Sequence, residues 1–288
     1  MQKSFNIFAA VTVTALALSL AVDPAKAATI SVYQTFDTQS SAQADGWAVF
    51  NNTINSNNYG WNSGNEVSGT GGQAGGIFTR TISTSAGYYA DLTIGESGTV
   101  AGTLNRATDS LVLSGLLRLS NADFDGTFRL GYFNTGAFGT VTSDFLGISI
   151  SEPSGATTNP FRATIVTTET SSAVISLNQD QTYSYDLTWT PTTGGAGTLA
   201  GTFAGQSVSL SALAGSGFFN AFGITSGYVG TSNSSLNTNG SYFDNVTYSV
   251  VVPEPTQMVF AAGVGAALGA WRLRKLRRNG RGSNATEC

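Results

Sequence analysis

Hydrophobic and polar residues alternate in short runs along most of the chain, from residue 29 to residue 252. The run TYSYDLTWT, for example, places Tyr183, Tyr185, Leu187 and Trp189 on one side of an extended backbone, with polar residues on the other side. Alternation with a period of two is the pattern of a β-strand that has one buried face. The central part of the chain is therefore predicted to consist of such strands.

Strand-like segments recur about fourteen times, and clusters of glycine, asparagine, serine and threonine separate them. No amphipathic helix of about ten residues or more is evident, and residues 210–213 would form one turn at most. The pattern predicts an all-β fold, an antiparallel β-sandwich over residues 28–252. The expected strands are 30–36, 46–50, 77–83, 88–94, 110–120, 126–133, 144–151, 161–167, 173–177, 182–190, 198–204, 206–210, 218–225 and 242–251.

Two stretches predict β-hairpins. The strands of WTPTTGGAGTLAGTF would join through a long glycine-rich turn, and those of TFAGQSVSL through Ala204-Gly205. With the opening FD…DGW and the closing YFDNVTYSV, these hairpins resemble exported domains of the concanavalin-A-like or jelly-roll kind. The resemblance implies that the first and last strands pair, which would bring Asp37 close to Asp244.

The first 27 residues have the pattern of a secretory signal peptide. Lys3 precedes an apolar run over residues 7–22, and the small-x-small triplet at residues 25–27 is typical of a cleavage site. We expect residues 1–27 to direct export through the Sec machinery and the mature protein to begin at Ala28. The alternative is an N-terminal anchor helix that is never cleaved.

A second apolar segment is followed at once by basic residues. Residues 258–271 carry no charge and would span about 21 Å as a helix. This is short of a ~30 Å hydrocarbon core, but long basic side chains can extend such a span. We predict one transmembrane helix over residues 256–271 and a basic cytoplasmic tail over residues 272–288. The basic residues expected to stop transfer are Arg272, Arg274, Lys275, Arg277 and Arg278.

The triplet Pro253-Glu254-Pro255 stands directly before this segment, and its prolines favour an extended backbone. The triplet, the apolar segment and the basic run together resemble the PEP-CTERM sorting signal. That resemblance implies processing by exosortase, a membrane-embedded protease or transpeptidase of bacteria that make exopolysaccharide. The alternative is a plain rigid linker between domain and anchor.

Charge and composition exclude several functions. Only 10% of residues are charged, and residues 28–252 hold five arginines, no lysine and fourteen acidic residues, a net charge of −9. A domain this acidic repels nucleic acid, which is therefore not an expected partner. The chain has no histidine, and its one cysteine is Cys288, so Ser-His-Asp and Cys-His catalysis and Cys/His zinc sites are excluded.

No enzyme activity is expected. A glycoside hydrolase needs two carboxylates that flank a sugar bond, and the closest acid pair, Asp123 and Asp125, is better interpreted as an acidic turn. Carboxylates that are distant in the sequence can still meet in space. A secreted glycoside hydrolase therefore remains an alternative.

Two kinds of ligand are compatible with the sequence. Asp37, Asp244 and Asn245 could bind a structural calcium ion together with loop carbonyls, because calcium takes six to eight oxygen ligands. No other cofactor is expected. The alternative interpretation is that both aspartates end strands in solvent.

The second ligand is carbohydrate. Trp47, Tyr59 and Trp61 lie in the asparagine-rich stretch GWAVFNNTINSNNYGWNSGN, which offers aromatic faces for sugar rings and amides for hydroxyl groups. The alternative is that Trp47 belongs to the core and that the stretch is a solvated loop.

These features together predict an exported protein that the inner membrane holds by its C-terminal helix until it is processed. After processing it would lie at the cell surface or outside the cell, with a structural or adhesive role in the envelope or the extracellular matrix. The first alternative is a module that binds exopolysaccharide, and the second is the hydrolase.

Overall fold

The computed structural model describes segments of the chain that all lie in one compact unit, Ala27–Pro255. The predicted signal peptide and the chain from residue 253 onward, with the sorting motif, the transmembrane helix and the basic tail, lie outside the described residues. Those residues are 28–50, 59–79, 86–92, 103–120, 126–135, 145–151, 161–167, 170–192, 196–212, 217–228 and 238–252.

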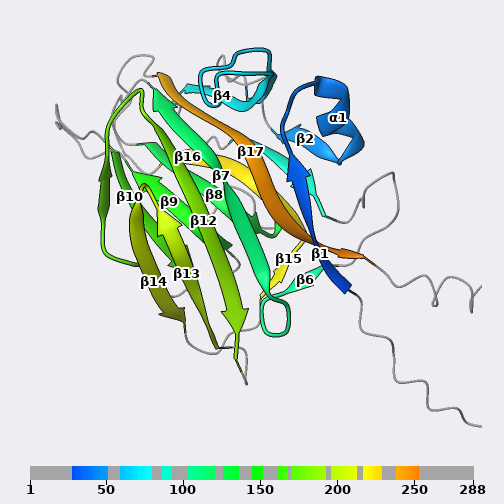
Figure 1. Cartoon of the computed structure of the whole chain (residues 1–288), viewed down its shortest axis with the longest axis vertical. Coiled ribbons are helices and arrows are strands. Elements are labelled where there is room, and N and C mark those ends of the chain that lie inside the picture. Colours follow the sequence, from blue (N-terminus) through cyan, green and yellow to red (C-terminus); the bar gives the residue numbers. More distant parts are fainter. Residues whose placement is uncertain are drawn as a thin grey trace, which may run out of the picture. The chain divides into compact units, whose positions relative to one another are not determined.

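Two antiparallel sheets make up most of the fold (Figure 1). The eight-stranded sheet runs in the order β14 (Gln206–Ala212), β13 (Gly197–Phe203), β12 (Thr182–Pro191), β7 (Leu111–Ser120), β17 (Thr238–Val252), β4 (Gln73–Thr79) and β3 (Gly60–Asn62), and β1 (Ala28–Gln34) also pairs with β17. The seven-stranded sheet runs in the order β11 (Ile175–Leu177), β10 (Phe161–Thr167), β9 (Phe145–Ser151), β8 (Gly126–Phe133), β16 (Ala221–Tyr228), β5 (Ala86–Asp91) and β2 (Trp47–Phe50).

Two smaller pieces complete the described structure. β6 (Leu104–Asn105) and β15 (Phe218–Phe219) form a two-stranded sheet of their own. α1 (Gln39–Ala44) is a single short helix between β1 and β2. The hydroxyl group of Thr38 caps it by accepting a hydrogen bond from the backbone N–H of Ser41 at 3.1 Å.

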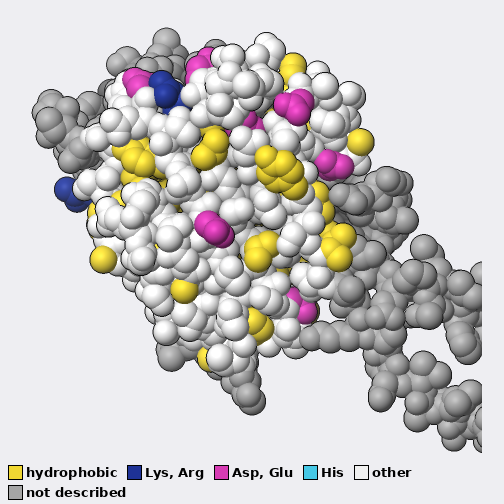
Figure 2. Space-filling view, viewed as in Figure 1, with side chains coloured by type: hydrophobic (Ala, Val, Ile, Leu, Met, Phe, Trp, Pro, Cys, Tyr) yellow, Lys and Arg dark blue, Asp and Glu magenta, His cyan; other side chains and the backbone are white. Residues whose placement is uncertain are grey.

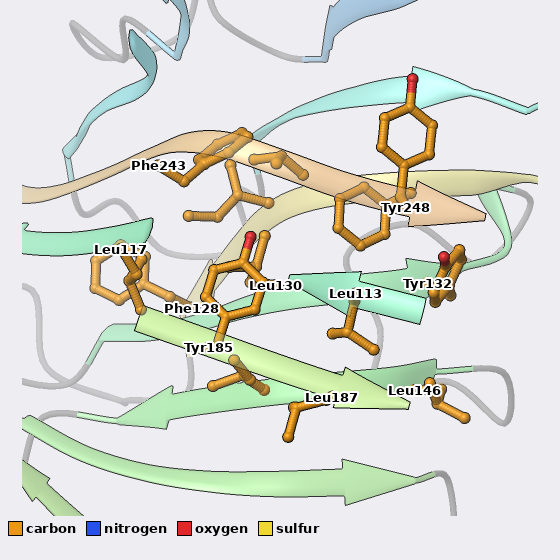
Figure 3. Packing of buried hydrophobic residues seen from close by; sticks show 14 of the residues in the cluster. Leu113, Leu117, Phe128, Leu130, Tyr132, Leu146, Tyr185, Leu187, Phe243 and Tyr248 are labelled. Atoms are coloured by element: carbon orange, nitrogen blue, oxygen red, sulfur yellow. The ribbon is translucent and has the colours of Figure 1, made fainter. Parts of the chain in front are cut away.

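The core lies between the two large sheets, and the alternation seen in the sequence builds it. Tyr185, Leu187 and Trp189 of β12 are buried, while Asp186 between them is exposed. Figure 3 shows side chains of both sheets facing one another, among them Leu113 of the eight-stranded sheet. Burial of apolar surface on this scale is the dominant force that holds such a sandwich together. The predicted all-β antiparallel sandwich is thus confirmed.

The face drawn in Figure 2 carries scattered acidic side chains, and its hydrophobic side chains lie among polar atoms. In the described part of the molecule, Arg118 reaches Asp180 at 3.7 Å, and both side chains are partly exposed to solvent. A surface ion pair of this kind adds little to stability.

Both predicted hairpins are present. β12 pairs with β13, and β13 pairs with β14 through the turn at Ala204 and Gly205. The φ angles of these two residues are +52° and +75°, as the central residues of a type I′ turn require. The twist of this turn matches the twist of the flanking strands. The two-residue turn places Phe203 opposite Gln206, and this pair sets the register of β13 and β14.

The first and last strands also pair, as the resemblance implied. β1 runs antiparallel to β17, with Gln34 opposite Val246. β4 pairs with the same edge of β17 as β1, but nearer the start of the strand, and the last pair is Phe243 opposite Ala74. Asp244 lies between these two pairings, where the register with β7 on the other side shifts at a β-bulge.

Several predicted boundaries were wrong. The strand expected over residues 218–225 is divided between β15 and β16, because Asn220 bonds to Phe133 and Leu92 instead of continuing a single ladder. The turn suspected over residues 210–213 belongs to β14 as far as Ala212. The sequence pattern also missed α1, because a helix of 6 residues is too short to show a period of 3.6.

Candidate functional site

A pocket lies where the two sheets part at one edge of the sandwich. β2 ends the seven-stranded sheet and β3 ends the eight-stranded sheet, and α1 lies next to both. Figure 1 shows α1 beside β2 at this edge. The pocket has a volume of about 460 Å³. It is lined by Gln39 and Gln43 of α1, Trp47, Ala48 and Val49 of β2, Tyr59 just before β3, Gly60 and Trp61 of β3, and Tyr88 of β5. We call it the edge pocket.

Trp47 forms the inner wall of the edge pocket and belongs to the core. Only 3% of its surface is exposed. Its ring packs edge-on against Phe36 at 4.8 Å between centroids and tilted against Tyr88 at 5.2 Å. Its indole N–H has no hydrogen-bond acceptor among the described residues. The core interpretation of Trp47 therefore holds, although the same ring also lines the pocket.

Tyr59 and Trp61 reach the pocket from the opposite sheet. Tyr59 is fully buried, and its hydroxyl group lies 2.8 Å from the hydroxyl group of Ser241 on β17. Trp61 is half-buried, and its indole N–H donates a hydrogen bond of 2.7 Å to the carbonyl oxygen of Phe36. These bonds fix both rings, so the aromatic wall is set before any ligand arrives. The three predicted sugar-contacting residues thus line a single pocket.

The asparagines of the same stretch have other roles or lie outside the described residues. Asn62 and Asn65 stabilise the loop that leads into β4: Asn62 accepts a bond of 2.6 Å from the N–H of Gly64, and Asn65 donates a 3.5 Å bond to the carbonyl of Gly69. Asn51, Asn52, Asn55, Asn57 and Asn58 fall in residues 51–58, outside the described part of the chain.

The polar groups of the pocket that sequence reasoning missed come from α1. Gln39 and Gln43 are four residues apart, so they lie on the same face of the helix. Both side chains are exposed. The only sequence signal for them was Thr38, a residue type that favours the start of a helix.

The predicted calcium ligands also come together in part. The β1–β17 register brings Asp37 near Asp244, and the negative charge of Asp37 helps to raise the pKa of Asp244. The main cause of that rise is burial, since only 1% of Asp244 is exposed. Hydrogen bonds from the hydroxyl group of Ser68 and, at 2.7 Å, from the N–H of Asn245 oppose the rise.

The surrounding backbone is shaped to bring these groups close. Asn245 adopts a φ of +52° at the β-bulge, and its side-chain oxygen accepts a bond of 2.9 Å from the hydroxyl group of Tyr33. Gly71 has a φ of +72° and approaches the Asp37 carboxylate so closely that a Cβ there would overlap it. Among the described residues, no three carboxylate, histidine or cysteine side chains form a group that could hold a metal. A cation here would need backbone carbonyls and amides as its other ligands.

The membrane and sorting predictions concern residues outside the described part. Pro253, Glu254, Pro255, the segment 256–271 and the basic residues after it are not among the described residues, nor are Asp123 and Asp125. Within the described segments, no helix is long and apolar enough to cross a membrane.

No protein-family model matches the chain, and no curated protein matches it. Among solved structures, the chain is similar to a protein of unknown function from Shewanella oneidensis MR-1, with 13% identity, a TM-score of 0.48, and coverage of 80% of this chain and 89% of the other. It is also similar to a PL-14 alginate lyase from Aplysia kurodai, with 10% identity, a TM-score of 0.42, and coverage of 79% and 99%. A third similar structure is the carbohydrate recognition domain of Emp47p, with 12% identity, a TM-score of 0.38, and coverage of 66% of this chain and 88% of the other. With TM-scores below 0.5, these similarities identify no function for this chain.

Proposed function

We propose that this chain is an exported protein of the cell envelope or extracellular matrix, and that its β-sandwich adheres to polysaccharide by binding glycan in the edge pocket. The observation that carries this proposal is a pocket lined by four aromatic side chains from both sheets, of which the half-buried Trp61 is the most exposed, with two glutamine amides beside it. Aromatic walls with a few polar groups are typical of small-molecule sites, and about 460 Å³ lies within their usual range of volumes.

Binding, without hydrolysis, is the activity that the pocket lining favours. Glycoside hydrolysis uses two carboxylates on either side of the sugar bond. Within the part of the chain that the structure describes, no acidic residue lines the edge pocket. The indole rings and amides there can hold a sugar, and the hydroxyl group of Tyr59 is already engaged with the hydroxyl group of Ser241.

Export and sorting complete the proposal. The signal peptide would deliver the domain across the inner membrane, and an exosortase-type enzyme would process the Pro253-Glu254-Pro255 motif. β17 ends at Val252, so the motif begins at the next residue, without a spacer. Processing there would release or transfer a sandwich whose last strand is intact.

A structural calcium ion is the second part of the proposal. Asp37 and Asp244 are close to each other, and no arginine or lysine takes part in the interactions that shift the pKa of Asp244. A cation between the two carboxylates would remove their repulsion, and it would tie the end of β1 to β17. Asn245 and backbone carbonyl groups would supply further oxygen ligands.

The glycan-binding function is tested by calorimetry of the full-length protein in detergent against a panel of oligosaccharides. Trp61→Ala removes the half-buried ring, and we expect at least a tenfold loss of affinity for whichever oligosaccharide the wild type binds. Phe218→Ala removes an exposed ring from β15, which does not line the pocket, and should leave binding unchanged.

Because Trp61→Ala removes a packed ring, Trp61→Phe is measured beside it. It keeps a ring but loses the bond to the carbonyl of Phe36. Equal binding by the wild type and both Trp61 variants would contradict the assignment of the site. Turnover of the bound oligosaccharide would instead support the hydrolase.

A further inference from the structure

None of the described residues that line the edge pocket is charged. Its aromatic and aliphatic side chains form the wall, and Gln39 and Gln43 supply the exposed polar groups. Neither amide is engaged in a hydrogen bond within the described part of the chain, where the polar contacts of α1 involve Thr38, Ser40 and Ser41. Two amides on one helix face are therefore available to a ligand.

The chemistry of an amide suits a hydroxyl group better than it suits an anion. The glutamine side chain has two N–H donors and one carbonyl acceptor, so it can both donate to and accept from neighbouring sugar hydroxyls. A carboxylate or a sulfate only accepts, and it is bound most strongly by a guanidinium or an ammonium group. The carbonyl oxygens of Gln39 and Gln43 could not bond to such an anion, because both groups can only accept hydrogen bonds.

Acidic residues stand at both ends of α1. Asp37 precedes the helix and is exposed, and Asp45 follows it as the C-cap, where its carboxylate accepts a 2.5 Å bond from the side chain of Gln34. With Asp37 assigned to the proposed calcium ion, Asp45 is the acidic residue at the end of α1 whose charge would disfavour an anionic ligand, and salt would weaken this effect. The domain as a whole adds to this effect, because residues 28–252 carry a net charge of −9.

The four arginines that the structure describes supply no positive charge to the lining of the pocket. Arg106 is buried near β6, Arg118 belongs to β7, Arg129 to β8 and Arg162 to β10, and none of the four lines the pocket. Arg80 lies outside the described residues.

From this arrangement we infer that the edge pocket selects neutral glycans over glycans that carry carboxylate or sulfate groups. The inference rests on the glycan-binding function proposed above and adds the class of saccharide. Neutral sugar hydroxyls satisfy the two amides, and the half-buried ring of Trp61 offers its exposed part to the apolar face of an uncharged ring. A uronate would bring its carboxylate into a pocket whose described lining has no cationic side chain to receive it.

The test uses pairs of hexasaccharides that differ only at C6: β-1,4-glucan, β-1,4-mannan and β-1,4-galactan, each neutral and in its fully C6-oxidised form. Binding to full-length protein in detergent is measured by calorimetry at 50 and 500 mM NaCl. We expect at least one neutral member to bind at least tenfold more tightly than its oxidised partner at 50 mM NaCl. The affinity for the neutral member should be independent of salt, because no ion pair forms.

Variants on α1 locate the effect. Gln39→Ala combined with Gln43→Ala should lower the affinity for the neutral member about tenfold or more, while Gln206→Ala, an exposed glutamine at the start of β14, should not change it. Tighter or equal binding of the oxidised partner would overturn the neutral selectivity but leave glycan binding intact. Neutral binding that is insensitive to the double variant would overturn the role of α1. Absence of binding to every member of the panel would contradict the glycan-binding function itself.

Discussion

Ala28, the first residue of β1, lies directly opposite Val252, the last residue of β17, and the two strands stay in antiparallel register as far as Gln34 opposite Val246. The first and last residues of the sandwich are therefore neighbours. Ala28 is also the predicted first residue of the mature protein, and Pro253 of the predicted sorting motif follows Val252. The two predicted processing positions are thus neighbours once β1 has joined β17.

The β1–β17 pairing should contribute substantially to stability through Val32. This side chain is 3% exposed and belongs to the core, so Val32→Ala removes two buried methyl groups. We expect a loss of about 2 kcal/mol in the free energy of unfolding, measured by denaturant titration. Ser31→Ala on the exposed side of the same strand should stay within about 0.5 kcal/mol of the wild type. A similar effect of both variants would mean that β1 is not held against the core.

The mature protein should begin at Ala28. Signal peptidase needs an extended, unpaired backbone, whereas Ala28 is paired in the folded sandwich, so we expect cleavage before β1 joins β17. N-terminal sequencing of the protein from its native host checks this prediction. A sequence that still starts at Met1 would show that the first segment is an uncleaved anchor.

Processing of the C-terminal segment should require the Pro-Glu-Pro triplet. Replacing Pro253, Glu254 and Pro255 with alanines leaves the apolar run and the basic residues in place, so the membrane anchor should remain while processing stops. The mass of the protein is compared in hosts with and without the sorting enzyme. If the chain up to Cys288 persists in both hosts, the segment is a permanent anchor.

The stability of the metal-free protein should depend on the protonation of Asp244. Burial is the main reason why the pKa of Asp244 lies above its ordinary value of 3.8; hydrogen bonds from Ser68 and Asn245 oppose this rise, and the charge of Asp37 adds to it. The protonated carboxyl group of Asp244 therefore contributes fully to the stability of the fold below pH 3.8, and this contribution is lost as the pH rises through the folded-state pKa. In chelator at pH 7, Asp244→Asn should melt at a higher temperature than the wild type, and the difference should shrink towards pH 3. Asp186→Asn, at an exposed position on β12, is the control.

In calcium, the wild type should melt at a higher temperature than Asp244→Asn, the reverse of the order expected in chelator. If Asp37 and Asp244 share the ion, millimolar calcium should raise the melting temperature of the wild type but not that of Asp244→Asn. A ligand at about 100 times its dissociation constant adds about 2.7 kcal/mol to stability. Identical melting temperatures of the wild type in chelator and in calcium would leave the two aspartates as an unmetallated pair.

The turn between β13 and β14 can be improved. Ala204 holds a φ of +52°, which is unfavourable for alanine and which asparagine tolerates, and Asn-Gly is the preferred pair for this turn. Ala204→Asn should therefore raise the free energy of unfolding by about 0.5 to 1 kcal/mol. Gly205→Ala, with a φ of +75° at that position, should lower it. A stabilising Gly205→Ala would contradict the type I′ geometry.

The sequence by itself determined the local features of this protein. Alternation in β12 placed Tyr185, Leu187 and Trp189 on the buried face, because side chains of a strand point to opposite sides in turn. Ala204-Gly205 identified a hairpin, because few residues accept positive φ angles. Composition excluded histidine and cysteine chemistry in the domain. Each of these conclusions depends on neighbouring residues or on simple counts.

Only the tertiary structure decided how distant segments meet. It placed Trp47 at the edge of one sheet and Tyr59 and Trp61 at the edge of the other, so that one short stretch of sequence lines both sides of a pocket. It also added Gln39 and Gln43, from a helix too short to leave a periodic pattern. The physical reason is that the order of strands in a sheet is set by which faces can be buried together, and that choice involves residues far apart in the chain.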